Sequence, residues 1–140
     1  MKKRLYMAMT FMVFLSLVGL VVMDAQVCTA QQKPSLTVVN PKVKMEKKTN
    51  IAIKGSGFAP GQEIRLVFWD ANGVMTIIND LVKPELKVDQ SGGFETSWDC
   101  GREIGKKLIK EGALVLTVTD SDYKTLAETQ ITFFKEKKKK

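Results

Sequence analysis

Residues 53–64 read IKGSGFAPGQEI, and this stretch decides the fold. Apolar residues alternate with polar ones on both sides of it, so two strands are joined by a glycine-rich loop. Gly55 and Gly57 permit a close backbone approach or an unusual φ angle, and Phe58 is placed to plug the end of a core. Pro60-Gly61 is typical of a turn with proline second and glycine third. A phosphate-binding loop is excluded, because no helix is expected after it and no Gly-Lys-Ser/Thr sequence closes it.

Short alternating runs separated by turn residues continue on both sides of this loop. This pattern is typical of an antiparallel sandwich or barrel. The expected strands are 36–39, 43–45, 49–55, 63–69, 74–81, 85–88, 94–98, 113–119 and 126–134. Because 43–45 can continue the first strand on the other sheet, we expect an all-β sandwich of seven to eight strands. Two facing sheets would bury Ile51, Ile53, Leu66, Phe68, Phe94, Trp98, Leu116 and Phe133.

Residues 99–112 break the alternation. Ile104 and Leu108 have helical spacing, which predicts one or two turns of helix over an end of the sandwich.

Three segments resemble the bacterial immunoglobulin-like domains of the IPT/TIG kind. Residues 53–64 are similar to the family's strand, Gly-Ser-Gly-Phe-x-Pro-Gly-Gln segment and strand, and residues 89–94 to its Asp-x-x-Gly-x-Phe turn. Residues 114–120 are similar to its Tyr-x-Leu-x-Val-Thr-Asp strand, with leucine in place of the tyrosine. The resemblance covers residues 35–134 and implies an immunoglobulin-like sandwich, from which the insertion at 99–112 departs. It implies little about function, because this fold hosts unrelated activities.

The amino-terminal residues have the composition of an export signal. A basic Lys-Lys-Arg at 2–4 precedes an apolar run over 5–23, and Cys-Thr-Ala at 28–30 offers small residues to a signal peptidase. We predict a helical signal peptide over residues 1–30, cleaved after Ala30, and therefore a periplasmic or secreted protein.

Other fates of this leader stay open. Its apolar run is long enough to span a bilayer, so it could be retained as a membrane anchor. Cleavage after Ala25 would leave Cys28 in the mature chain, where it could reach Cys100, and a lipidated Cys28 is a further alternative.

The net charge of +7 lies mostly outside the folded body. Residues 31–134, the predicted immunoglobulin-like domain, carry 14 basic and 13 acidic side chains. A nucleic-acid partner is therefore not expected, since such proteins carry a basic stripe on the fold. Residues 135–140 form a lysine-rich tail that we predict to be disordered. This tail either keeps the protein soluble or attaches it weakly to anionic lipid or polysaccharide, so membrane contact would be weak or limited to the leader.

The residue inventory argues against catalysis. There is no histidine, which excludes the usual hydrolase triads and common zinc sites. Cys100 has no Cys-x-x-Cys neighbour, and a glycosidase would need a deep cleft that a small sandwich seldom has. We expect no enzymatic activity and no cofactor.

Aspartates in expected turns are the only weak metal candidates: Asp70, Asp89, Asp120 and Asp122. If successive strands alternate in direction, these turns lie at one end of the sandwich, and clustered carboxylates suit calcium. Aspartate is also common in turns because its side chain hydrogen-bonds the local backbone, and this is the more ordinary reason for its presence here.

The opposite end is expected to carry the 55–62 loop, residues 82–84 and the insertion. Four basic residues of the insertion are the candidate binding residues: Arg102, Lys106, Lys107 and Lys110. Our leading hypothesis is a non-catalytic module that contacts an envelope protein or glycan through them. These lysines could equally be the solvated face of a covering helix.

The alternative function is a structural or accessory subunit. It would pair its 126–134 edge strand with another exported protein. Of the two tryptophans, Trp98 is expected in the core and Trp69, beside a turn, is the one expected to be exposed.

Overall fold

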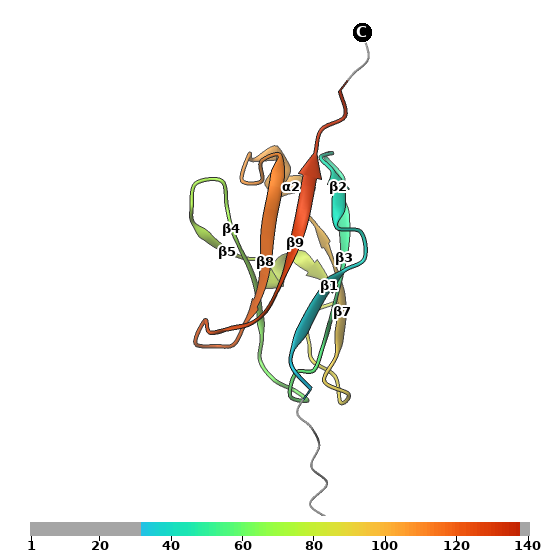
Figure 1. Ribbon diagram of the computed structural model, residues 1–140, viewed down its shortest axis with the longest axis vertical. Coiled ribbons are helices and arrows are strands. Elements are labelled where there is room, and N and C mark those ends of the chain that lie inside the picture. Colours follow the sequence, from blue (N-terminus) through green and yellow to red (C-terminus); the bar gives the residue numbers. More distant parts are fainter. Residues whose placement is uncertain (1–31, 138–140) are drawn as a thin grey trace, which may run out of the picture. The chain divides into compact units, whose positions relative to one another are not determined.

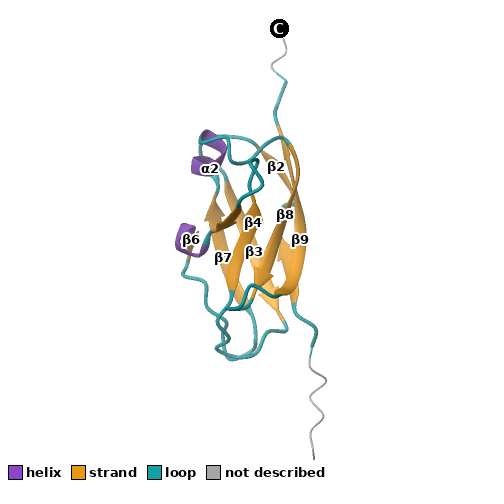
Figure 2. Ribbon diagram, turned by 90° about the vertical axis from the view of Figure 1, so that its left-hand side faces the viewer, coloured by secondary structure: helices purple, strands orange, loops and turns teal. Residues whose placement is uncertain are grey.

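Alternating apolar residues build two sheets that face each other across one core, in a computed structural model that describes residues 32–137 (Figure 1). The four-stranded sheet has the order β1-β3-β7-β6, with β1 Ser35–Val38, β3 Asn50–Ser56, β7 Phe94–Asp99 and β6 Val82–Lys83. The five-stranded sheet has the order β2-β9-β8-β4-β5, with β2 Lys42–Lys44, β9 Thr125–Phe134, β8 Gly112–Thr119, β4 Arg65–Trp69 and β5 Met75–Ile77. The described residues also form two short helices, the 3₁₀ helix η1 Asn79–Leu81 and the α-helix α2 Gly101–Gly105 (Figure 2).

The predicted core is confirmed. All eight side chains named from the alternation pattern are buried. The Phe68 and Trp98 rings, one from each sheet, lie 5.3 Å apart between centroids, so aromatic packing joins the two layers.

The 53–64 loop also has the predicted form. The Gln62 N–H donates to the Ala59 carbonyl (2.9 Å) and Gly61 has φ +71°, which is the expected proline-glycine turn. Phe58 is buried beside Phe94, with ring centroids 5.6 Å apart, and closes this end of the core.

The predicted strand 74–81 consists of the short strand β5 and the 3₁₀ helix η1, and β6 follows directly in the other sheet. The Asn79 side chain accepts a hydrogen bond from the Leu66 N–H (2.8 Å) and donates one to the Ile64 carbonyl (3.0 Å). After β5 ends, these side-chain bonds take the place of backbone pairing with the start of β4. The chain turns there toward the other sheet. There β6 continues in the same direction as β5. Their antiparallel neighbours, β4 and β7, both lead toward the insertion at 99–112, because β7 runs into α2 and Ala71, just after β4, bonds Leu108. The turn expected at 82–84 therefore does not reverse the chain.

Three further expectations are corrected. Residues 85–88 form no strand; Leu86 and Val88 pack against the core from an irregular segment, which explains their strand-like alternation. The sandwich has nine strands among the described residues, and β2 pairs in parallel with the last three residues of β9. That part of the predicted edge strand 126–134 is therefore covered.

The predicted helix is confirmed but ends early. Lys107 has φ +59°, and the Leu108 N–H donates to the Glu103 carbonyl (3.0 Å), a bonding pattern that closes a helix C-terminus. Leu108 therefore lies beyond α2.

The described chain starts at one end of the sandwich and leaves at the other (Figure 1). We call the second end, defined by residues 42–49, 70–73, 99–111 and 134–137, the α2 end. No helix within residues 32–137 is long and apolar enough to cross a membrane. The predicted signal peptide with Cys28, and the tail residues 138–140, lie outside the described residues.

Candidate functional site

The insertion is fixed to the α2 end by backbone contacts. A Cβ on Gly101 would lie 2.1 Å from the Lys47 carbonyl oxygen, so glycine lets α2 sit directly on the loop before β3. The Ala71 N–H donates to the Leu108 carbonyl (2.8 Å), and Lys110 Nζ donates to the Ala71 carbonyl (3.4 Å). The insertion and the β4–β5 turn therefore form one surface.

The four candidate binding residues share this end but not one site. All four side chains are exposed. Arg102 lines a hollow of about 400 Å³ beside the four-stranded sheet. Lys107 and Lys110 line another of about 590 Å³ with an apolar floor that includes Met45. Lys106 lines neither of them.

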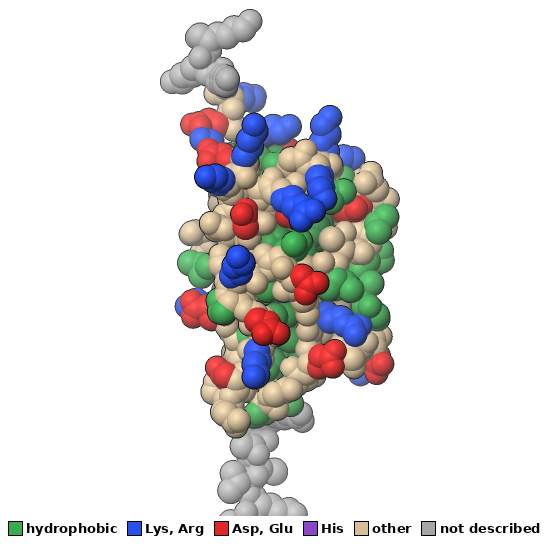
Figure 3. All heavy atoms as spheres, turned by 180° about the vertical axis from the view of Figure 1, so that it is seen from behind, with side chains coloured by type: hydrophobic (Ala, Val, Ile, Leu, Met, Phe, Trp, Pro, Cys, Tyr) green, Lys and Arg blue, Asp and Glu red, His purple; other side chains and the backbone are tan. Residues whose placement is uncertain are grey.

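The α2 end is nevertheless the basic end of the molecule. It carries 10 basic and 6 acidic side chains, against 6 and 8 in the rest of residues 32–137. Figure 3 shows most of the basic side chains in the upper part of the view, where the chain leaves the sandwich. A partner with a negative surface would be steered to this end.

An apolar patch that the sequence analysis missed lies next to it, on the outer face of the five-stranded sheet. Its members are Trp69, Ile77 and Val115, which are 61%, 43% and 46% exposed, and we call them the Trp69 patch. The register pairs Trp69 with Met75 and Val67 with Ile77 on this face. Outward positions of a solvent-facing sheet are usually polar, so this apolar alternation was the available signal.

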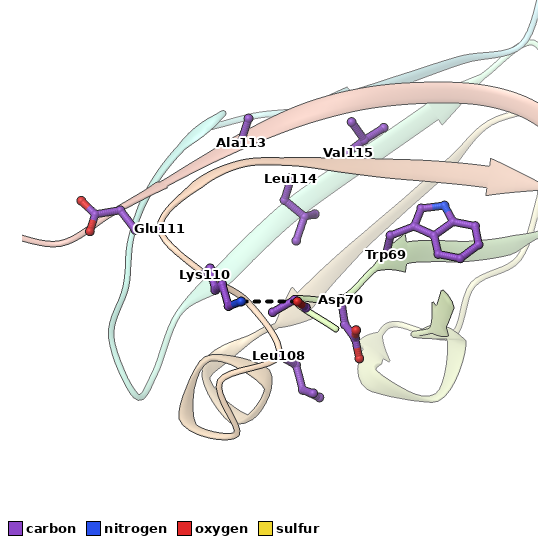
Figure 4. A pocket seen from close by; sticks show the side chains of 9 residues that line it. Trp69, Asp70, Leu108, Lys110, Glu111, Ala113, Leu114 and Val115 are labelled. Carbon is purple, nitrogen blue, oxygen red and sulfur yellow. Dashed lines mark hydrogen bonds between the residues drawn. The ribbon is translucent and has the colours of Figure 1, made fainter. Parts of the chain in front are cut away.

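A hollow of about 300 Å³ joins the Trp69 patch to the insertion (Figure 4). It is lined by Trp69 and Val115 from the patch and by Leu108 and Lys110 from the insertion. Figure 4 shows Lys110 reaching across toward the β4–β5 turn. An exposed aromatic side chain thus meets a rim of mixed charge, which holds Asp70, Lys110 and Glu111.

The turn aspartates do not share one end, contrary to the expectation. Arg65 at the start of β4 pairs with Thr119 at the end of β8, so Asp120 and Asp122 lie far from Asp70, which follows β4. β5 and β6 run in the same direction, so the chain moves away from Asp70 through both strands. Asp89 therefore lies at the same end of the sandwich as Asp120 and Asp122. Because the chain does not reverse at residues 82–84, the 55–62 loop also lies at the end that carries Asp89, Asp120 and Asp122. It does not lie beside the insertion.

Each aspartate that begins one of these turns accepts hydrogen bonds from backbone N–H groups of the same turn. Oδ1 of Asp70 accepts from the Asn72 and Val74 N–H groups, and Oδ1 of Asp120 accepts from the Asp122 and Lys124 N–H groups. Within residues 32–137, no three acidic or cysteine side chains gather as metal ligands.

Cys100 is fully buried and has no disulfide partner among the described residues. Burial raises the pKa of its thiol to about 12, so the thiolate is absent at neutral pH.

No family model matches this chain, and no curated protein matches it. Among solved structures, macromomycin matches at 13% identity and TM-score 0.46, over 72% of this chain and 99% of that one. A Pseudomonas fluorescens alkylpurine DNA glycosylase, AlkC, bound to DNA containing an abasic site analog, matches at 10% identity and TM-score 0.43, over 73% of this chain and 30% of that one. Both likenesses are too distant to indicate a function.

Proposed function

We propose that this protein is a non-catalytic binding module of the cell envelope that contacts a protein partner through the Trp69 patch. The observation that carries the proposal is the exposure of Trp69 among other exposed apolar side chains. Interface cores are enriched in aromatic residues that lose water on binding and are surrounded by a polar rim. Lys110 and Asp70 supply such a rim.

The chemistry of the patch favours a protein over a glycan. Ile77 and Val115 offer no side-chain hydrogen bonds, which a sugar would need beside a stacking aromatic ring. The basic α2 end adds a preference for an acidic partner, because complementary charge raises association rates and is screened by salt. Arg102, Lys106 and Lys107 act in this proposal by attraction over distance, whereas Lys110 borders the contact itself.

We also propose an exported immunoglobulin-like domain of the IPT/TIG kind. Support comes from the strand orders, which correspond to the A-B-E-D and G-F-C sheets of that sandwich with added flanking strands. The three segments that resemble the family and the signal-like residues 1–30 also support it. A periplasmic or secreted location follows from that leader.

Crosslinking of the full-length protein in its native envelope, followed by mass spectrometry, tests the binding proposal. Trp69→Ser is expected to remove the main crosslinked partner. Val39→Ser is the matched control, since Val39 is 51% exposed but lies outside the patch. Equal crosslinking of both variants would overturn the proposal.

One observation favours the accessory-subunit alternative. β5 ends the five-stranded sheet with three residues, and among the described residues no strand pairs with its outer side. Strand addition there would depend on main-chain bonds. A complex that survives Trp69→Ser and neutralisation of the insertion lysines would favour this alternative.

A further inference from the structure

A second hollow lies on the other sheet, away from the Trp69 patch. Its volume is about 400 Å³, within the range of small-ligand pockets. It is lined by Asn50, Leu81, Lys83, Ser97, Asp99, Arg102 and Glu103.

Strand register assembles one wall of this hollow. Asn50 of β3 pairs with Asp99 of β7, and Lys83 of β6 pairs with Ser97 of β7. Ser97 and Asp99 alternate with buried Thr96 and Trp98, so they face outward from the core. Four polar side chains from three neighbouring strands therefore share the outer face of the sheet.

Helix α2 supplies the other wall, because it begins two residues after β7 and brings Arg102 and Glu103 over the sheet. Glu103 is only 4% exposed, and its Oε2 has no hydrogen-bond partner among the described residues. A buried carboxylate without a partner is strongly unfavourable, and such groups normally pair with a cation. No pattern in the sequence indicated this burial, since an acidic residue on a short surface helix usually faces water.

The charges around the hollow are of both signs, and no ion pair among residues 32–137 involves them. Asp99 and Glu103 are acidic, Lys83 and Arg102 are basic, and no ion pair within 4.0 Å joins any two of them. Asp99 uses Oδ1 to accept a hydrogen bond from the Gly101 N–H (3.1 Å). Its other oxygen and the Glu103 carboxylate remain for a ligand.

We propose that this hollow binds a small zwitterion that carries a primary ammonium group and a carboxylate, as in a free α-amino acid. The ammonium group is held by Glu103 and Asp99, and the carboxylate by the Arg102 guanidinium and Lys83. Arginine binds carboxylates through two parallel hydrogen bonds, and bonds between charged partners are stronger than neutral ones. An ammonium group beside Glu103 would compensate the buried negative charge.

A divalent cation fits the hollow less well. Two carboxylates, Asn50 and Ser97 offer oxygen ligands, but Lys83 and Arg102 line the same space and would repel the metal. A zwitterion satisfies both signs of charge.

Thermal shift and calorimetric titration of the full-length protein test this inference. The probes are the common L- and D-amino acids, added singly, together with ethylamine, propionate and calcium chloride. Ethylamine and propionate each retain one charged group of alanine. At least one amino acid is expected to bind saturably and raise Tm, while the two analogues and calcium do not.

Variants separate a ligand site from a structural defect. Arg102→Gln and Glu103→Gln are each expected to weaken binding about tenfold or more. Glu103→Gln is also expected to raise Tm without ligand, because it removes an unpaired buried charge. Lys106→Gln, on the same segment but outside the hollow, is the matched control and should change neither quantity. If Glu103→Gln fails to fold, the exposed Arg102 still provides the test.

Three results would overturn the inference: no amino acid binds the wild-type protein, binding is unchanged by both variants, or calcium raises Tm and the amino acids do not. The site is independent of the proposed protein contact. Trp69→Ser should leave amino-acid binding intact.

Discussion

The Arg65 guanidinium lies 4.6 Å from the centroid of the Tyr123 ring, and Arg65 Nη1 donates a hydrogen bond to the Ser121 carbonyl (2.9 Å). These contacts fasten the start of β4 to the turn between β8 and β9. Tyr123 has φ +63°, a conformation that disfavours residues with a Cβ.

The same backbone design occurs in three turns of this protein. Each begins with an aspartate whose N–H donates to the carbonyl four residues later, and whose own carbonyl accepts from the residue three later. The fourth residue of each turn has positive φ; these residues are Gly73, Gly92 and Tyr123. Tyrosine replaces glycine where Arg65 can stack on its ring.

This comparison predicts the effect of changing Tyr123. Tyr123→Gly should be more stable than Tyr123→Ala by about 1 kcal/mol, because only glycine adopts positive φ without strain. A double-mutant cycle with Arg65→Ala should give a coupling of about 0.5–1 kcal/mol, as for exposed cation–π pairs. Urea denaturation measures both. Equal stability of the glycine and alanine variants would show that the strain is absent.

Lys107 closes helix α2 in the left-handed conformation that glycine usually occupies. Lys107→Gly should therefore stabilise the protein by about 1 kcal/mol in urea denaturation. Lys106→Gly is the control, because Lys106 has φ −79° and gains nothing from glycine. A gain of equal size in both variants would attribute the effect to lost charge and not to conformation.

The buried thiol of Cys100 predicts alkaline destabilisation. Its pKa rises from 9.0 to about 12 on folding, mainly because burial disfavours the thiolate. The folded state holds this proton more tightly, so the contribution to stability is complete below pH 9 and is lost as pH rises toward 12. The stability of the wild-type protein should fall more steeply over this range than that of Cys100→Ala. Iodoacetamide should label Cys100 only after unfolding, and rapid labelling of the folded protein would contradict its burial.

The lowered pKa of Asp89 predicts the opposite pH dependence of stability, a loss in acid. Its pKa is lowered below 3.8, first by the Ser91 hydroxyl, which donates to Asp89 Oδ1 (2.6 Å), and then by backbone N–H groups including that of Gly93. The folded state favours the carboxylate, so the contribution is present above pH 3.8 and is lost as pH falls. Ser91→Ala should raise the pKa of Asp89 in an NMR titration and reduce stability in acid. Gln90→Ala, at the neighbouring turn position, should change neither.

The amino-acid sequence by itself determined the layered architecture and its core. Period-two alternation fixes which side chains face inward, because neighbouring residues of a strand point to opposite faces. Burial of Trp98, exposure of Trp69 and the Ala59–Gln62 turn therefore followed from local pattern alone.

Only the tertiary structure decided which loops meet. The two hydrogen bonds of the Asn79 side chain move the chain between sheets without reversing it, and this one event sends Asp89, Asp120 and Asp122 to the end opposite Asp70. The pairing of β7 with β3 and β6, together with the seating of Gly101 on Lys47, likewise buries Glu103 beside the outer face of the sheet. Such contacts join residues distant in sequence, and alternation along a single strand carries no information about them.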